Sequence, residues 1–138
     1  MWRDLTVFLL LPPFMFLLDY LWLGLAASRI YKKDLAPFLR LSGGDLDPVL
    51  WAAVVVYIAI PLGIVLFVLP RVSPESPIGS GLLWGMAYGL VVYTIYEMTN
   101  YSLLKGWPLR LAFVDIAWGA FLNGTATAFA AAIRGRMS

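Results

Sequence analysis

Three carboxylic acids, Asp19, Glu97 and Asp115, stand inside strongly apolar stretches of this chain. An ionisable side chain in hydrocarbon is costly, so an acid inside a membrane helix is a functional-site hypothesis by default. A carboxyl group of this kind can act as a general acid or base tuned by burial, handle protons, or bind a small molecule or a lipid headgroup. These three acids are therefore the candidate centre of the chemistry.

The composition indicates an integral membrane protein. The chain of 138 residues is 62% hydrophobic and 13% charged, whereas soluble domains are about 45–50% apolar and about 25% charged. Its mean hydropathy is +0.83. The net charge of +2 comes from basic residues scattered among loops, which argues against a nucleic-acid partner. The first apolar run continues past Pro12 and Pro13 without a cleavage site before Asp19, so we expect a retained helix and not a signal peptide.

Cysteine and histidine are both absent. Their absence excludes disulfides, thiolate nucleophiles, a histidine base and zinc, iron–sulfur or haem sites of the usual kinds. A site made only of carboxylates would need more than three scattered acids to be a good metal site. We therefore expect no metal and no cofactor.

Four apolar stretches are each long enough to cross a bilayer, whose hydrocarbon core needs about 20 helical residues. They cover residues of about 5–27, 48–69, 80–104 and 109–133. Short loops between them predict an all-α, antiparallel four-helix bundle, built as a single transmembrane domain over residues 1–138. Because the number of spans is even, we expect both termini on the same side of the membrane.

Local signals refine this arrangement. Pro12 and Pro13 predict a kink in the first span, and Pro61 predicts a bend in the second. The second span has no other distinctive feature, and we interpret it as a packing or lipid-facing helix. The third span carries three glycines at a spacing of four, which predicts close helix packing; they are Gly81, Gly85 and Gly89.

The loop from Ser28 to Asp47 is the only sizeable one. Residues 35–41, LAPFLRL, predict a short amphipathic segment at the membrane interface. Gly43 and Gly44 break any helix, and Asp47 followed by Pro48 predicts a helix N-cap with proline at the first helical position.

Counting residues along the predicted helices places the three acids at the same expected depth in the membrane. Each lies about seven or eight residues from the same end of its span, which is roughly 10–12 Å below one surface at 1.5 Å per residue. We therefore expect a single polar pocket within the bundle. Its other predicted members are Trp22, Tyr96, Asn100 and Trp118, with Asn123 deeper.

A structural role is the alternative to a pocket. Buried polar groups can hydrogen-bond to each other and fix the helix order, at about 0.6 kcal/mol per bond in a membrane. Lys105 and Arg110 are near enough in sequence to reach Glu97 or Asp115. Clustering favours a pocket, because three carboxylates together require a bound proton or cation. Four tryptophans near span ends, Trp2, Trp51, Trp84 and Trp107, are expected to be interfacial anchors.

Four short motifs extend over nearly the whole chain: Asp19-Tyr-Leu-Trp22-Leu-Gly24, Tyr96-Glu97-Met-Thr99-Asn100-Tyr101, Trp107-Pro108, and Asp115-Ile-Ala-Trp118-Gly119. With them the chain resembles a family of small bacterial four-helix membrane proteins known only as a domain of unknown function. The resemblance implies this fold and the importance of these positions, and it implies no activity. Glu97 stands where relatives are expected to carry aspartate.

Three functions follow as hypotheses. The first is a non-enzymatic protein of the bacterial inner membrane that binds a small molecule, a lipid headgroup or protons in the polar pocket. The second is a membrane enzyme acting on lipid, with Glu97 or Asp115 as the general acid or base. The third is a structural or assembly subunit, as a homo-oligomer or in a larger complex. Six basic residues on the loop side against four on the other leave the orientation open.

Overall fold

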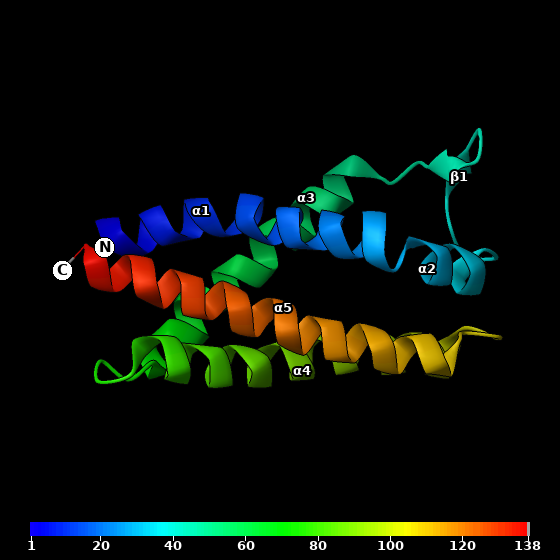
Figure 1. Cartoon of the computed structure of the whole chain (residues 1–138). Coiled ribbons are helices and arrows are strands. Elements are labelled where there is room, and N and C mark those ends of the chain that lie inside the picture. Colours follow the sequence, from blue (N-terminus) through cyan, green and yellow to red (C-terminus); the bar gives the residue numbers. More distant parts are fainter. Residues whose placement is uncertain (138) are drawn as a thin grey trace.

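The computed structural model describes residues 1–137. It contains four helices that are long and apolar enough to cross a membrane, Trp2–Ala26, Leu50–Arg71, Pro77–Leu103 and Leu109–Arg136. They alternate in direction, with the two termini at one end and the loops after the first and third spans at the other (Figure 1). The predicted antiparallel four-helix membrane fold is therefore confirmed, and the protein is a multi-pass membrane protein.

The first two spans are not uniform α-helices. Helix α1 (Trp2–Asp19) continues through Pro12 and Pro13 and passes into a π-helix, η1 (Tyr20–Ala26). The N–H of Ala27 donates to the carbonyl of Trp22 at 2.7 Å, which closes the wide turn. Helix α3 (Leu50–Gly63) likewise passes into η2 (Ile64–Val68) and then into η3 (Leu69–Arg71). Wide turns of this kind occur frequently at functional sites, and η1 begins directly after Asp19.

The first loop differs from the prediction in two places. Its helix, α2 (Ser28–Leu35), ends where the predicted amphipathic segment 35–41 would begin. A short hairpin follows, with β1 (Leu41–Ser42) paired to β2 (Asp45–Leu46) around two glycines of positive φ. The predicted N-cap at Asp47 and Pro48 is also wrong, because α3 begins at Leu50 with Val49 as its N-cap residue.

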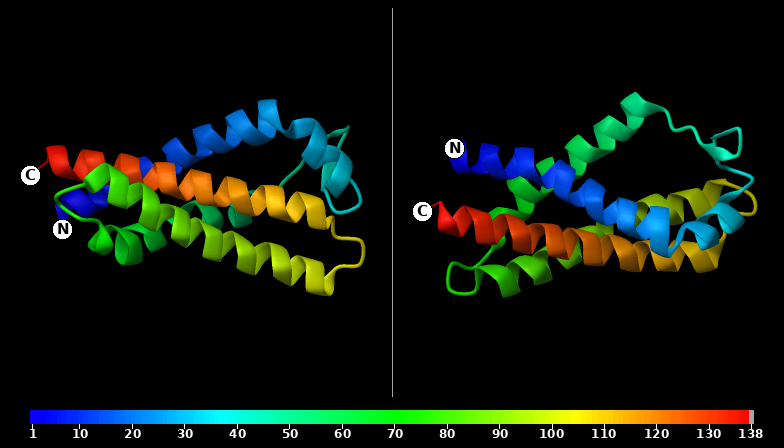
Figure 2. Two further views of the ribbon diagram at one scale, coloured as in Figure 1. Left: turned by 60° about the horizontal axis from the view of Figure 1, so that its bottom comes forward. Right: turned by 45° about the horizontal axis from the view of Figure 1, so that its top comes forward.

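Helices α4 (Pro77–Leu103) and α5 (Leu109–Arg136) form the closest pair, side by side along their length (Figures 1 and 2). The predicted glycine stripe explains this approach. A Cβ on Gly81 would lie 3.3 Å from the backbone of Ala128, and a Cβ on Gly89 would overlap the carbonyl oxygen of Gly119. Only hydrogen in place of a side chain permits such backbone contact.

The apolar core lies at the terminal half of the bundle. Val7, Leu11 and Met15 of α1 pack there with Ile64 of η2 and Leu122 of α5. The first turns of α3 diverge from the other helices toward the hairpin end (Figure 2). Buried apolar side chains thus fill the terminal half of the bundle.

The arrangement of the helices makes a direct prediction about topology. The native chain has no cysteine, so a single introduced thiol reports one position. A cysteine at Ser76, in the loop before α4, should react with an impermeant maleimide from the side opposite to a cysteine at Ser42 of the hairpin. Labelling of both from one side would contradict the antiparallel order. Ser138, the other expected reporter of the terminal side, lies outside the described residues.

Candidate functional site

Asp19 is the last residue of α1, and two donors from other spans converge on its carboxyl group. The hydroxyl of Tyr57 in α3 donates to Oδ2 at 2.7 Å, and the indole Nε1 of Trp118 in α5 donates to Oδ1 at 2.9 Å. The side chain thereby joins three spans at one point. Both of its oxygens act as acceptors.

Asp115 of α5 binds a residue that lies outside the spanning helices. The hydroxyl of Tyr31 in α2 donates to Oδ1 of Asp115 at 2.7 Å, and the indole Nε1 of Trp22 donates to the same hydroxyl oxygen at 3.3 Å. Burial, reinforced by the nearby Asp115 carboxyl, raises the pKa of Tyr31 well above its usual range. Tyr31 therefore stays a neutral donor at any ordinary pH.

Glu97 of α4 is the most buried of the three acids, with 4% of its surface exposed. The indole Nε1 of Trp107 donates to its Oε2 at 2.8 Å. The Glu97 and Asp115 side chains line one cavity together. Within residues 1–137 neither Lys105 nor Arg110 forms an ion pair with either acid.

A pair of stacked indoles connects the two groups of hydrogen bonds. The rings of Trp22 and Trp118 lie 4.9 Å apart between centroids at an interplanar angle of 7°. Trp118 belongs to the Asp19 group and Trp22 to the Asp115 group. The structure therefore brings all three acids into one polar region, hereafter the acid cluster: Asp19, Glu97 and Asp115 with Trp22, Tyr31, Tyr57, Trp107 and Trp118.

Two cavities adjoin the acid cluster. The first, of about 240 Å³, lies under α2 and the hairpin, and its polar lining includes Tyr31, Lys32, Glu97 and Asp115. The second, of about 400 Å³, is apolar and lies between α3 and α4 where α3 diverges; its lining includes Val56, Ala59, Ile60, Val92 and Tyr93. Tyr96 and Asp115 line both. We call them the polar chamber and the apolar chamber.

The remaining predicted site residues have different surroundings. Tyr96 is half-exposed at the boundary of the two chambers, with the side chain of Asn100 as its hydrogen-bond neighbour one turn along α4. Asn123 is fully buried between α4 and α5, away from the acids, and donates to the carbonyl of Gly119 at 2.8 Å. Asn123 therefore belongs to the helix contact and not to the chamber walls.

Three members of the acid cluster were not predicted from the sequence: Tyr31, Tyr57 and Trp107. Tyr57 is the single tyrosine of the second span, which we interpreted as a packing or lipid-facing helix. A lone hydroxyl group in an apolar span could have indicated a hydrogen bond to another helix. Trp107 was expected as an interfacial anchor, yet it turns its indole N–H inward to Glu97. Tyr31 lies in a loop, where no helical spacing connects it to Asp115.

The donor set matches organic hydrogen-bonding partners better than metals. Among residues 1–137, no three His, Cys, Asp or Glu side chains come together as a possible metal site.

A family model described as "Predicted membrane protein (DUF2177)" matches residues 5–132. No curated protein and no solved structure matches the chain.

Proposed function

This chain belongs to that family of predicted membrane proteins (DUF2177), and on that premise we propose that it binds an amphiphilic small molecule or lipid of the bacterial cell membrane. The polar head would occupy the polar chamber, against Glu97 and Asp115. The hydrocarbon part would occupy the apolar chamber between α3 and α4.

One observation carries this proposal: Tyr96 and Asp115 line both chambers. A cavity of about 240 Å³, whose mainly apolar wall carries the carboxyl groups of Glu97 and Asp115, and an apolar cavity of about 400 Å³ therefore meet at shared side chains. Ligand sites are mostly apolar, with a few convergent polar groups that fix orientation. If the acid cluster served only to fix the order of the helices, its hydrogen bonds would suffice and no adjoining cavity would be needed.

The chemistry of the lining favours a particular kind of head group. Glu97 and Asp115 offer carboxyl oxygens, so the complementary partner is a donor such as an amine or a hydroxyl group. Lys32 lines the same chamber, so its described charged lining is two acids and one base, and a phosphate in direct contact with the two acids would meet like charge. We therefore propose an amine-bearing or polyhydroxylated amphiphile as the ligand class.

Filling the apolar chamber tests the proposal without altering an acid. The Ala59→Phe variant places a ring in that chamber, whereas Ala87→Phe makes the same change at an exposed position of α4 that lines neither chamber. The proteins are extracted in native lipid with an amphipathic polymer, and bound lipids are quantified by mass spectrometry. We expect one lipid class enriched at least about tenfold over bulk membrane in wild type and in Ala87→Phe, and lost in Ala59→Phe; a tenfold ratio corresponds to about 1.4 kcal/mol.

Equal lipid profiles for the two phenylalanine variants would refute the binding proposal. The Asp115→Asn variant then identifies the head group. An ammonium group loses its charge-assisted hydrogen bond to the amide, whereas a hydroxyl group still donates to the amide oxygen. If the Asp115→Asn variant retains the bound lipid, the head group is therefore hydroxylated.

A lipid-modifying enzyme is the second candidate, favoured by the closeness of Glu97 and Asp115. Two carboxyl groups that line one cavity can supply an acid and a base in one site. Incubation of the purified protein with the lipid class it retains distinguishes the candidates. A new lipid product that is absent with Glu97→Gln would establish the enzyme, and unchanged lipid would leave the binding protein.

A further inference from the structure

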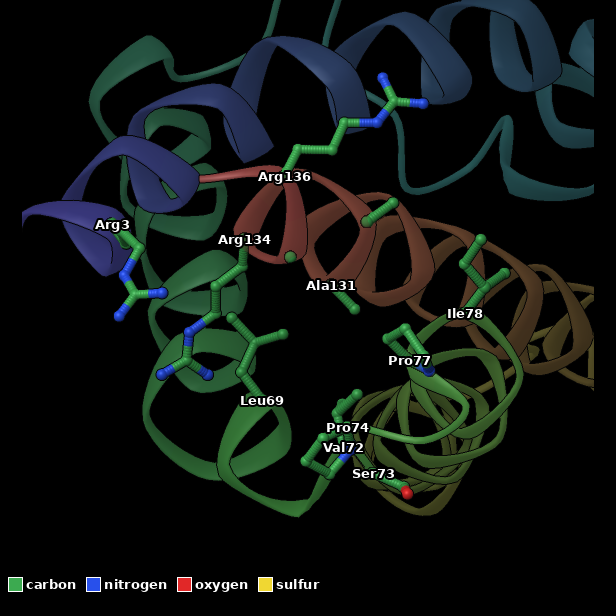
Figure 3. A pocket seen from close by; sticks show the side chains of 12 residues that line it. Arg3, Leu69, Val72, Ser73, Pro74, Pro77, Ile78, Ala131, Arg134 and Arg136 are labelled. Atoms are coloured by element: carbon green, nitrogen blue, oxygen red, sulfur yellow. The ribbon is translucent and has the colours of Figure 1, made fainter. Parts of the chain in front are cut away.

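A larger cavity lies at the opposite end of the bundle from the acid cluster. It has a volume of about 760 Å³ and lies where η3 ends, α4 begins and α5 ends. Its charged lining consists of three arginines, Arg3, Arg134 and Arg136, with no acidic residue. Figure 3 shows the guanidinium groups of Arg3 and Arg134 on one side, near Leu69, and the side chain of Arg136 extending away from them.

The positive charge of this cavity is only partly neutralised. Arg134 Nε lies 3.1 Å from Oδ1 of Asp4, and the N-terminal amine also lies near Asp4, at 3.9 Å from Oδ2. Within residues 1–137 neither Arg3 nor Arg136 forms an ion pair. Arg136 is exposed, and an exposed side chain changes rotamer on a fast timescale.

The walls below the guanidinium groups are apolar. Leu69, Val72 and Ile78 line them, with Ala131 on the α5 side. Pro77 and Ile78 belong to the first turn of α4, a helix of 27 residues whose N-terminal amides add positive potential on the same side. The cavity is bordered by the ends of three candidate membrane spans, where η3 and α5 end and α4 begins, and span ends are the parts of such helices nearest the lipid headgroups.

From this combination we propose that the cavity binds the phosphodiester of an anionic phospholipid, with the acyl chains against Leu69 and Ile78. Guanidinium groups match phosphate oxygens bidentately, and apolar walls suit a lipid better than a free ion. This site does not depend on the function proposed for the acid cluster, because the two lie at opposite ends of the bundle.

The test uses purified full-length protein in neutral detergent, titrated with phosphatidylglycerol or phosphatidylcholine and read by native mass spectrometry. Arg3→Gln combined with Arg136→Gln removes two guanidinium groups and leaves the Arg134–Asp4 ion pair intact. Each basic residue near a membrane surface contributes roughly a fivefold effect. The double variant should therefore bind phosphatidylglycerol about 25-fold more weakly than wild type.

The matched control is Arg40→Gln combined with Lys105→Gln, which removes the same charge at exposed positions that line no described cavity. We expect the control to bind as wild type does, and wild type to prefer phosphatidylglycerol to phosphatidylcholine. Equal weakening in both variants would mean general charge attraction and would overturn the site. Displacement of the lipid by excess inorganic phosphate would overturn the lipid assignment in favour of a free phosphate.

Discussion

Alanine at Gly89 is expected to separate α4 from α5 and to destabilise the fold by about 3 kcal/mol or more. A Cβ there would overlap the carbonyl oxygen of Gly119, which is backbone and cannot rotate away. Overpacking of a core side chain typically costs about 1–3 kcal/mol because neighbours can adjust, and here the whole helix would have to move. The effect would oppose helix propensity, since alanine is favoured over glycine inside a helix by roughly 1 kcal/mol.

The same substitution at Gly135 is the control. Gly135 lies in α5, and among residues 1–137 a Cβ there would meet no side chain and no backbone outside its own helix within 4 Å. Thermal unfolding in detergent, followed by tryptophan fluorescence, should show Gly135→Ala at or slightly above wild-type stability and Gly89→Ala far below it. Equal melting temperatures for Gly89→Ala and wild type would mean that α4 and α5 are not in backbone contact.

Asp19→Ala is expected to lower the free energy of unfolding by about 2–4 kcal/mol. The change leaves two donors, the Tyr57 hydroxyl and the Trp118 indole N–H, without their acceptor in a region shielded from water. An unsatisfied buried donor costs about 1–3 kcal/mol. That penalty exceeds the average of about 0.6 kcal/mol for a hydrogen bond between membrane helices.

The Asp19→Asn variant removes the acidic group but keeps the ability to hydrogen-bond, so it separates these two contributions to the free energy of unfolding. Its amide oxygen still accepts from Trp118, and its amide N–H₂ can donate to the Tyr57 oxygen, so Asp19→Asn should cost less than half as much as Asp19→Ala. The double variant Asp19→Ala with Tyr57→Phe should lose less unfolding free energy than the two single variants together. Each single change already removes the same Asp19–Tyr57 hydrogen bond. Strict additivity of these two variants would contradict the Asp19–Tyr57 contact.

Composition and apolar length were sufficient to predict the four spans, because a bilayer imposes a minimum length that loops do not reach. The grouping of the acids in one region followed from counting residues along each helix, since helices convert residue number into distance along their axis. Glycines 81, 85 and 89 likewise indicated where helices would touch. Span length, position along a helix and glycine spacing are all properties of a single helix, so they can be determined from the sequence alone.

The partners of the acids were not predictable in the same way. Tyr57 belongs to none of the motifs and lies 38 residues from Asp19 along the chain. Tyr31 lies 84 residues from Asp115. Such pairs depend on how helices rotate about their axes and on where α2 folds back. Periodicity within one segment carries no information on either, and the same reason explains why Asn123 was placed with the acids instead of between α4 and α5.

The hydrogen bond from Tyr31 to Asp115 joins an extramembrane helix to an intramembrane acid. A head group that competes for the same lone pair of the Asp115 Oδ1 displaces that hydroxyl, and a head group that binds at another lone pair must fit beneath α2. Closure of the loop and occupancy of the chamber are then thermodynamically linked, with each altering the other by the same factor. Amide hydrogen exchange in α2, measured from the aqueous side, would therefore report what is bound inside the membrane.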